Sequence, residues 1–209
     1  MPGMNTCLDT HERDLRARGF ASIAGVDEVG RGSLFGAVVA AAVVLSPRHP
    51  VRGLNDSKQL TPQRREVLAR RICERALAWS IAEIDAATID RVNIYHASRL
   101  AMKVAVESLG FPPDYLLIDA VSIDIPIAQW PMVKADECCH AVAAASIVAK
   151  VYRDRKMCEF HEVYPEYGLV RHKGYSCPEH YRALKKHGPT PLHRMSFEPV
   201  RQSAGAREA

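Results

Sequence analysis

Two apolar runs joined by a glycine-rich turn constrain the fold of this chain more than any other stretch. The first run, residues 21–26, leads directly into Asp27 and Glu28, and the turn that follows contains the sequence Gly-Arg-Gly at 30–32. The second run, residues 37–45, consists of small and β-branched residues without a polar interruption, which is typical of a buried strand. The stretch therefore predicts a hairpin of two strands that carries two carboxylates beside its turn.

The glycines of this turn allow more than one interpretation. Gly30, Gly32 and Gly36 are spaced almost like a dinucleotide-binding fingerprint, and Asp56 lies where a ribose-binding acid is expected. A pyrophosphate loop, however, leaves a strand and opens a helix, whereas residues 37–45 have the pattern of a strand. Two carboxylates before the turn would also repel a phosphate unless a metal ion lies between them, as in a divalent-metal phosphodiesterase. A solvated acidic pair at a hairpin turn is the remaining alternative.

The rest of the chain alternates helical and extended patterns. Helices are expected at residues 9–18, 61–77, 93–109, 141–162 and 178–187, and further strands at 78–84, 115–118 and 130–134. In the segment 61–77, the apolar residues are expected to face inward and the arginines to face solvent. With 209 residues, of which 47% are hydrophobic, the chain can bury a sizeable core, and no linker separates two large domains. These features predict one α/β unit with a mixed sheet covered by helices.

Two further carboxylates repeat the arrangement at the hairpin. Asp119 ends the apolar run 115–118, and Asp136 lies where the chain enters a helix. A sheet could bring them beside Asp27 and Glu28, and a set of oxygen ligands prefers a hard cation such as Mg²⁺ or Mn²⁺. Two such ions activate a water and stabilise the leaving oxygen of a phosphodiester. The residue types alone are consistent with a metal nuclease, and solvated acids at turns are the alternative.

Charge is concentrated in the last third of the chain. The net charge is +4, but residues 150–201 contain eleven Lys or Arg against six Asp or Glu, with five of the nine histidines. We expect this third to face a polyanion, although a solvated basic surface would have the same composition. No apolar run approaches the ~20 residues of a membrane helix, and the first ten residues lack a signal-peptide pattern. We expect a soluble, cytoplasmic protein.

The cysteines form no recognised ligand motif. None of the six belongs to a CxxC pair; they are Cys7, Cys73, Cys138, Cys139, Cys158 and Cys177. The sequence Cys138-Cys139-His140 suggests zinc, but adjacent side chains rarely converge on one ion and no second ligand pair follows. We interpret these thiols as structural or incidental.

Eight motifs occur in order between residues 21 and 200. They are GVDEVGRG at 25–32, LNDSK at 54–58, NI at 93–94 with AM at 101–102, LID at 117–119, KAD at 134–136, AAASIVAK at 143–150, YRD at 152–154, and HKGY at 172–175 with GP at 188–189 and HR at 193–194. Together they resemble type 2 ribonuclease H, the bacterial ribonuclease HII. One such motif would be weak, whereas eight in register are specific.

The resemblance implies a ribonuclease H-like fold, in which a five-stranded mixed sheet is flanked by helices and a small helical carboxy-terminal region lies over the substrate groove. Residues 1–163 would form the catalytic domain and residues 164–209 the substrate-contacting region of the same compact unit. It also implies that two divalent ions, Mn²⁺ or Mg²⁺, are held by four carboxylates: Asp27, Glu28, Asp119 and Asp136.

The implied activity is that of an endoribonuclease. The family hydrolyses the RNA strand of RNA/DNA hybrids and also cuts on the 5′ side of ribonucleotides embedded in duplex DNA, leaving a 3′-hydroxyl and a 5′-phosphate. Such an enzyme removes primers and misincorporated ribonucleotides during DNA replication and repair. We expect a monomer with these duplexes as its partners.

The resemblance also assigns residues to the substrate. The backbone of Gly30, Arg31 and Gly32 would contact the ribose 2′-hydroxyl, by which RNA differs from DNA. Tyr175 would stack on the sugar of the next nucleotide. Polar side chains would hold phosphates without reading sequence: Asn55, Ser57, Lys58, Ser146 and Lys150.

Several of these residues have simpler interpretations. Ser146 could be a small helix-packing residue, and Tyr175 could serve only in packing. For Asp154 we prefer an ion pair with Lys150, four residues earlier, to a role in metal binding.

The chain departs from the family pattern without losing a carboxylate. Ser33, Phe35 and Ala37 replace a proline, a small residue and a proline after the glycine turn; Ala135 replaces a glycine; and Ser176-Cys177 replaces a small residue and a threonine. We expect changes in turn rigidity, and with it in the preference for isolated ribonucleotides.

Three other classes were weighed against this resemblance. Ribonuclease HIII has an additional amino-terminal domain and lacks the tyrosine, whereas this chain is short and has Tyr175. A non-catalytic nucleic-acid binding module would leave four carboxylates unexplained in a polyanion groove. Resolvases and integrases of the same fold would lack the pair formed by the Gly-Arg-Gly turn and Tyr175.

Overall fold

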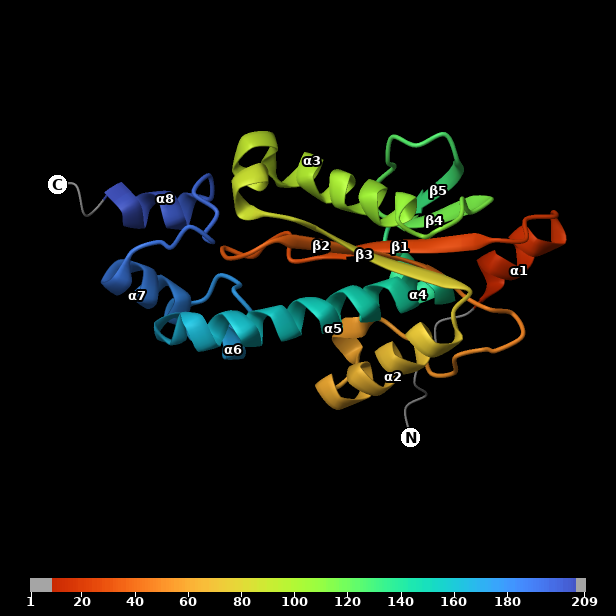
Figure 1. The fold of residues 1–209 in the computed structure, drawn as a ribbon, viewed down its shortest axis with the longest axis horizontal. Coiled ribbons are helices and arrows are strands. Elements are labelled where there is room, and N and C mark those ends of the chain that lie inside the picture. The colour runs from red at the N-terminus through yellow and green to blue at the C-terminus, as the bar shows by residue number, and fades with distance from the viewer. Residues whose placement is uncertain (1–8, 206–209) are drawn as a thin grey trace.

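A five-stranded mixed sheet forms the centre of the molecule (Figure 1). The computed structural model describes residues 9–205, so Cys7 and the end of the predicted carboxy-terminal region lie outside the described residues. The strands, in the spatial order β3-β2-β1-β4-β5, are β1 Ile23–Val29, β2 Val38–Val44, β3 Ala78–Ile84, β4 Tyr115–Asp119 and β5 Ala128–Met132. β2 is antiparallel to both β1 and β3, whereas β4 runs parallel to β1 and to β5. The predicted fold class is confirmed.

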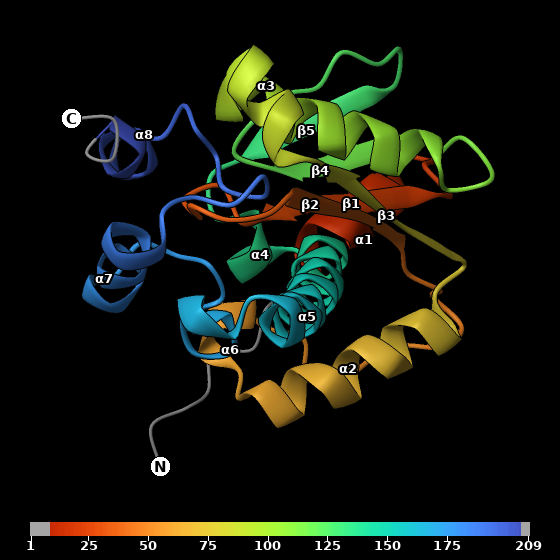
Figure 2. The same ribbon diagram turned by 60° about the vertical axis from the view of Figure 1, so that its left-hand side comes forward.

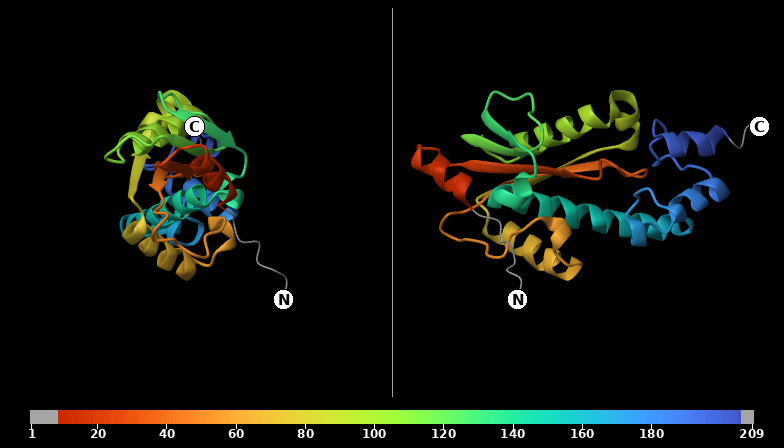
Figure 3. Two further views of the ribbon diagram at one scale, coloured as in Figure 1. Left: turned by 90° about the vertical axis from the view of Figure 1, so that its right-hand side faces the viewer. Right: turned by 180° about the vertical axis from the view of Figure 1, so that it is seen from behind.

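Helices cover both faces of the sheet. α3 (Ala86–Glu107) lies on one face, and α5 (His140–Val163) with α2 (Pro62–Arg75) lies on the other (Figure 2). The shorter elements are α1 Thr10–Ala17, the 3₁₀ turn Ser57–Gln59, α4 Ala135–Cys138, the 3₁₀ turn Pro165–Tyr167, α6 Leu169–His172, α7 Pro178–His187 and α8 Glu198–Gly205. α1 and the pair α7 and α8 lie at opposite ends of the molecule (Figure 3).

The unbroken apolar run of β2 is explained by burial on both sides. Side chains alternate along a strand, so Val38, Ala40 and Ala42 pack into the core beneath α3, whereas Val39 and Ala41 pack into the core beneath α5 and α2. A strand with helices on both faces has no solvent side. A polar residue would be buried at any of these positions, which is why the run contains none.

β1 and α5 approach each other closely at Gly25. A Cβ atom at this position would be 2.0 Å from the carbonyl carbon of Ala141, in the first turn of α5. The alanine-rich start of α5 presents little side-chain volume, and Ala143, Ala144 and Ala145 are fully buried. The glycine and the alanines together let the helix lie directly on the strand that carries Asp27.

Some boundaries differ from the sequence-based expectation. β1 does not end before Asp27 but continues through Glu28 to Val29, because both residues pair with β2. α3 begins at Ala86, earlier than expected, and has a kink at Asn93 (φ 67°, ψ 166°). There the Asn93 Oδ1 atom accepts a hydrogen bond from the His96 amide at 3.1 Å. The expected helix start is thus the cap of the second half of α3.

Within residues 9–205, none of the helices is both long enough and apolar enough to cross a lipid bilayer.

Two buried histidines link the segments of the carboxy-terminal region. The Thr190 amide donates to Nδ1 of His193 at 2.9 Å, and the Nε2 atoms of His193 and His180 are 3.1 Å apart. Because Nδ1 of His193 is an acceptor, its Nε2 carries the proton and donates to His180. His180 Nδ1 then donates to the carbonyl of Tyr175, 3.1 Å away. Both rings are neutral, since burial lowers the pKa of His180 to about 4 and that of His193 to about 3.

We predict that Gly25→Ala destabilises the protein by at least about 3 kcal/mol, because its methyl group would overlap the backbone of α5 rather than a movable side chain. The matched control is Gly32→Ala, since a Cβ there meets no atom of the described part of the chain within 4 Å. Urea denaturation checks both variants. Equal stabilities for the two variants would contradict the close approach of β1 and α5.

We also predict that the histidine pair makes stability depend on pH. Their folded pKa values lie below the ordinary value of 6.5, so their contribution is present above about pH 6.5 and is lost as the pH falls towards the folded pKa values. By pH 5 the loss is about 2 kcal/mol for each histidine. The buried carboxyl groups act in the opposite direction, so the test compares proteins at each pH. The double variant His180→Gln, His193→Gln should lose less stability than the parent between pH 7 and pH 5, and parallel curves would contradict the assignment.

Candidate active site

Three carboxylates meet at one edge of the sheet. β1 and β4 are parallel, with Val26 opposite Ile118, so Asp27 and Asp119 follow in adjacent positions. Glu28 comes next on β1, and the Asp27 carboxylate accepts a hydrogen bond from its amide at 2.7 Å. One oxygen from each of the three side chains lies within 4.8 Å of the others. The expected convergence of Asp27, Glu28 and Asp119 is therefore present.

Burial and mutual repulsion disfavour the charged forms of these acids. Asp27 is 6% exposed, and its pKa is raised well above the usual value by burial and then by the charges of Glu28, Asp119 and Asp136, against a hydrogen bond from Ser146. Burial also raises the pKa of Glu28, although Arg31 opposes it. Buried carboxylates that repel one another and offer only oxygen ligands fit a hard divalent cation, which would remove the repulsion.

The fourth expected carboxylate, Asp136, lies on α4, outside the group of three whose oxygens converge, although its charge acts on Asp27. It lies just after Lys134, which adopts the left-handed conformation (φ 59°, ψ 41°) and turns the chain into the helix. The Ala135 amide donates to Oδ1 of Asp119 at 2.9 Å, which ties α4 to the end of β4. Ala135 itself is helical, so no glycine is needed there.

Lys58 is the cation nearest to Asp136. Its Nζ atom lies 3.8 Å from Asp136 Oδ2 and 4.0 Å from Asp56 Oδ1. Burial raises the pKa of Asp136 to about 6; Lys58 opposes this effect, while Asp56 and Asp119 add to it. Partial burial lowers the pKa of Lys58, but the surrounding carboxylates outweigh it and raise the value. Asp56 had no expected role in the active site. Its Oδ1 atom accepts a hydrogen bond from the Lys58 amide at 2.9 Å and so caps the 3₁₀ turn that carries Lys58.

A cavity of about 460 Å³ opens beside these carboxylates. Its lining contains all of the expected site residues except Asn55 and Asp136. The full lining is Asp27, Glu28, Val29, Gly30, Arg31, Gly32, Ser57, Lys58, Asp119, Ser146, Lys150 and Tyr175. Asp136 does not line the cavity, but it lies 3.8 Å from Nζ of Lys58, which does. The side-chain amide of Asn55 donates instead to Gln59 Oε1 at 3.2 Å.

The polar side of the cavity is built by α5 and the 3₁₀ turn. The hydroxyl oxygens of Ser146 and Ser57 are 3.0 Å apart, so Ser146 has a polar partner in addition to its place in the helix. Lys150 Nζ donates to Asp154 Oδ1 at 2.7 Å, which confirms the expected ion pair. The expectation that Arg65 faces solvent is wrong: its Nη1 donates to the carbonyls of Ser57 (2.8 Å) and Leu60 (2.7 Å).

The first two glycines of the glycine loop, residues 30–36, differ in the space around their Cβ positions. Gly30 has φ 94°, and a Cβ there would lie 2.3 Å from Arg153 Nε. Gly32 has open space at its Cβ position. Gly30 is therefore required by the protein itself, whereas the bare backbone at Gly32 faces the cavity.

Tyr175 reaches this loop from the carboxy-terminal region. A β-bridge pairs it with Ser33, and the Leu34 amide donates to the Gly174 carbonyl at 2.9 Å. The Tyr175 ring lies 5.3 Å from the guanidinium carbon of Arg153 and 5.9 Å from Lys150 Nζ. Segments that are far apart in sequence thus meet at one wall of the cavity.

The comparisons with known proteins agree with this geometry. The family model for ribonuclease HII matches residues 24–200. The chain belongs to the ribonuclease HII family. It is 64% identical over 199 residues to the ribonuclease HII of Solibacter usitatus, covering 95% of this chain and 87% of that protein.

Solved structures support the same assignment. The ribonuclease H2 of Pyrococcus horikoshii is similar with a TM-score of 0.80 and 27% identity, over 90% of this chain and 99% of that one. Bst ribonuclease HIII in complex with Mn²⁺ has a TM-score of 0.68 at 21% identity, over 90% of this chain and 70% of that one, a likeness of fold alone.

Family membership decides among the alternatives. The chain is a hydrolytic endoribonuclease of the type that acts on RNA/DNA hybrids, and the family depends on divalent metal ions. A non-catalytic binding module and a dinucleotide-binding loop are therefore excluded.

Two buried arginines were missed by the sequence analysis. Arg153 and Arg194 are both fully buried. Arg194 donates from Nε to the Gly36 carbonyl (3.0 Å) and from Nη1 to the Arg31 carbonyl (2.8 Å). Burial lowers its pKa to about 9, with Arg153 adding to the effect.

Arg153 holds the same loop from the side of α5. It donates from Nη2 to Ser33 Oγ (2.7 Å) and the Phe35 carbonyl (3.1 Å), and from Nη1 to the Lys173 carbonyl (2.9 Å). One signal in the sequence could have identified it. Arg153 lies four residues after Ala149 and four before Met157, both buried, so it occupies an apolar stripe of the helix.

Ser33 and Phe35, which depart from the family pattern, take part in the contacts between the glycine loop and its surroundings. Ser33 Oγ lies 2.9 Å from the carbonyls of both Phe35 and Gly174, and accepts from Arg153. Phe35 is buried, with its ring centroid 4.8 Å from that of His193 and 5.6 Å from that of Phe160. The loop is thus fastened to the carboxy-terminal region by residues that replace the usual proline and small residue.

Proposed function

We propose that this chain hydrolyses the RNA strand of RNA/DNA hybrids and also cuts duplex DNA on the 5′ side of embedded ribonucleotides. The products would carry a 3′-hydroxyl and a 5′-phosphate. The observation that carries this proposal is one cavity that joins a cluster of carboxylates to an exposed glycine backbone. Such an enzyme would remove primers and misincorporated ribonucleotides.

Asp27, Glu28, Asp119 and Asp136 would hold the divalent ions. When bound, two such ions supply an activated water and stabilise the leaving oxygen. The raised pKa values of Asp27, Glu28 and Asp136 support this role, because groups that repel one another without a cation bind one favourably. Mn²⁺ or Mg²⁺ fits the oxygen ligands, and the Mn²⁺ complex of Bst ribonuclease HIII is consistent with the first.

The backbone at Gly30, Arg31 and Gly32 would test for the 2′-hydroxyl. Two features support this. Among residues 9–205, no atom lies within 4 Å of the Cβ position of Gly32, so a ribose can approach the main chain. The Arg31 carbonyl already accepts from Arg194, which fixes the orientation of the peptide groups before substrate binds. A preorganised backbone discriminates between sugars without reading the base.

Side chains around the cavity would position the duplex through its phosphates. Lys58 extends into solvent, with 82% of its side chain exposed, and its distances of 3.8 to 4.0 Å to carboxylates leave its ammonium accessible. Ser57, Ser146 and Lys150 line the same cavity. Asn55 would need to release Gln59 to reach a phosphate. These contacts carry no sequence information, which suits an enzyme that acts at any sequence.

Tyr175 would stack on the sugar of the nucleotide that follows the ribonucleotide. Its ring is held beside Arg153 and its backbone is bridged to Ser33. We propose that residues 164–209 act as the substrate-contacting region and residues 1–163 as the catalytic domain of one unit. A monomeric state and a cytoplasmic location stay predictions.

We predict that Asp27→Asn and Asp119→Asn each lower the rate of cleavage at least a thousandfold, about 4 kcal/mol of lost transition-state stabilisation, while duplex binding survives. An amide keeps the shape of the carboxylate but loses the charge that holds the cation. Single-turnover cleavage and fluorescence anisotropy with the same hybrid measure the two properties. Asp14→Asn on α1 is the control for an equal change in net charge. Retained turnover in either active-site variant, at saturating Mn²⁺, would sink the metal assignment.

The substrate proposal is tested with three duplexes of one sequence: an RNA/DNA hybrid, all-DNA, and DNA with a single ribonucleotide. We expect no cleavage of the all-DNA duplex and one nick on the 5′ side of the ribonucleotide, in Mg²⁺ and in Mn²⁺ separately. Gly32→Ala should lower kcat/KM on the single ribonucleotide at least tenfold with unchanged stability, because its methyl group would point into the cavity. Cleavage on the 3′ side, or unaltered kcat/KM in this variant, would contradict the assigned role of the loop.

A further inference from the structure

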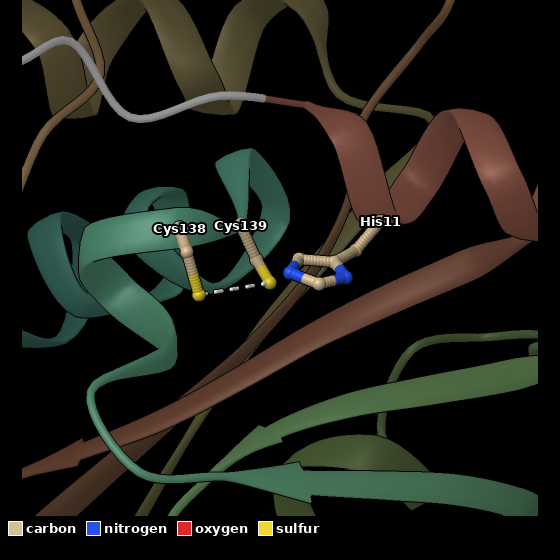
Figure 4. Close-up of side chains that lie close together, drawn as sticks. All are labelled: His11, Cys138 and Cys139. Atoms are coloured by element: carbon tan, nitrogen blue, oxygen red, sulfur yellow. Dashed lines mark hydrogen bonds between the residues drawn. The ribbon is translucent and has the colours of Figure 1, made fainter.

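A second group of potential metal ligands lies away from the active-site cavity. His11 projects from α1 towards Cys138, at the end of α4, and Cys139, the residue before α5 (Figure 4). One ligand atom from each of the three residues lies within 4.8 Å of the others. Unlike the active site, this group offers sulfur and nitrogen and no oxygen.

The backbone explains why adjacent cysteines converge here. Cys138 is the last residue of α4, whereas Cys139 is extended (φ −127°, ψ 120°) before the next helix begins. This change of conformation turns both side chains to one side. The two neighbouring thiols therefore lie close together, and the imidazole beside them is that of His11.

The spacing of the sulfurs matches a shared ion. The Sγ atoms of Cys138 and Cys139 are 3.8 Å apart. Two sulfurs that each lie about 2.3 Å from a tetrahedral ion are about 3.8 Å from each other. A disulfide would require about 2.05 Å. The His11 ring is also oriented, because it forms a T-shaped pair with Trp130, with ring centroids 5.1 Å apart and an interplanar angle of 82°.

We propose that His11, Cys138 and Cys139 bind one thiophilic divalent cation, for which Zn²⁺ is the probe. Each thiol would release its proton to solvent as its sulfur becomes a ligand. Cys139 is buried but His11 and Cys138 are only half-buried, so the fourth position is open to water. Soft and hard ligand sets select different ions, so the catalytic carboxylates and this site need not compete.

The bound ion would connect parts of the chain that are far apart in sequence. α1 is already attached by Leu15, which is fully buried, and by Glu12, whose Oε1 accepts from the Ala141 amide at 2.8 Å. The ion would add a link from α1 to α4, the short helix that carries Asp136. We expect it to act as a structural staple, stabilising the folded chain in proportion to its occupancy.

Cobalt absorption tests the ligands directly. Co²⁺ added to the reduced protein should produce a near-ultraviolet thiolate-to-cobalt charge-transfer band that saturates at one ion per chain. Carboxylates give no such band, so Co²⁺ in the catalytic site does not contribute. The band should disappear in the double variant Cys138→Ser, Cys139→Ser and weaken at least tenfold in apparent affinity in His11→Ala. Cys73→Ser, a half-buried cysteine on α2, is the matched control, and Asp119→Asn should keep the band.

Thermal denaturation provides the second readout. Zn²⁺ at about a hundredfold excess over its Kd should raise Tm by roughly 5 to 10 °C in the parent and in Cys73→Ser. The rise should be absent from the double variant. His11→Ala keeps both thiols in place, so it tests the proposal even if the double variant folds poorly.

Three outcomes would overturn the proposal. One is the absence of a charge-transfer band in the reduced parent protein. Another is an equal band, or an equal rise in Tm, in His11→Ala and the parent. The third is a parent protein whose mass lacks two hydrogens until a reductant restores them, with loss of this difference in the double variant, because the pair would then be a disulfide.

Discussion

The guanidinium group of Arg153 is buried where α5, the glycine loop and the carboxy-terminal region meet. Removing a charged group from water costs several kcal/mol, and here the acceptors are neutral: the hydroxyl of Ser33 and the carbonyls of Phe35 and Lys173. The cost is offset only when all three segments are in place. Arg194, also buried, donates in the same way to the carbonyls of Gly36 and Arg31 in this loop. The conformation of the loop therefore depends on the assembled fold and not on its own sequence.

The carboxylates work against the stability of the fold. Asp27 is buried among three other acids, and folding raises its pKa well above the usual value, first because of burial. A hydrophobic residue would be more stable at this position. What forces the acids together is the contact at Gly25, which lays α5 on β1, and the parallel pairing of β1 with β4. The close approach of α5 to β1 at Gly25 thus lies two residues from the unfavourable charge of Asp27.

Sequence patterns identified the strands and the main helices, because apolar periodicity is local. The residues that contact the cavity were assigned through the resemblance to ribonuclease HII, and all of them except Asn55 and Asp136 line it. What the sequence patterns missed depends on contacts between distant segments. Arg65 is a polar residue in a helix, and only the packed structure shows that the carbonyls of Ser57 and Leu60 need its donors. The continuation of β1 through Asp27 also depends on pairing with β2. Asn93 was read as a helix start because it does cap a helix, although one that continues across a kink.

The substitutions after the glycine turn illustrate two ways to make a loop rigid. A proline restricts φ in the folded and unfolded chain alike. Ser33 and Phe35 impose no such local restriction; they instead bind Arg153 and pack against His193. Rigidity in this chain is therefore conditional on the carboxy-terminal region, which also carries Tyr175. Arg153 contacts both Ser33, next to Gly32, and the ring of Tyr175, and His193 packs against Phe35 in the same loop. The glycine loop and the carboxy-terminal region therefore share one set of contacts.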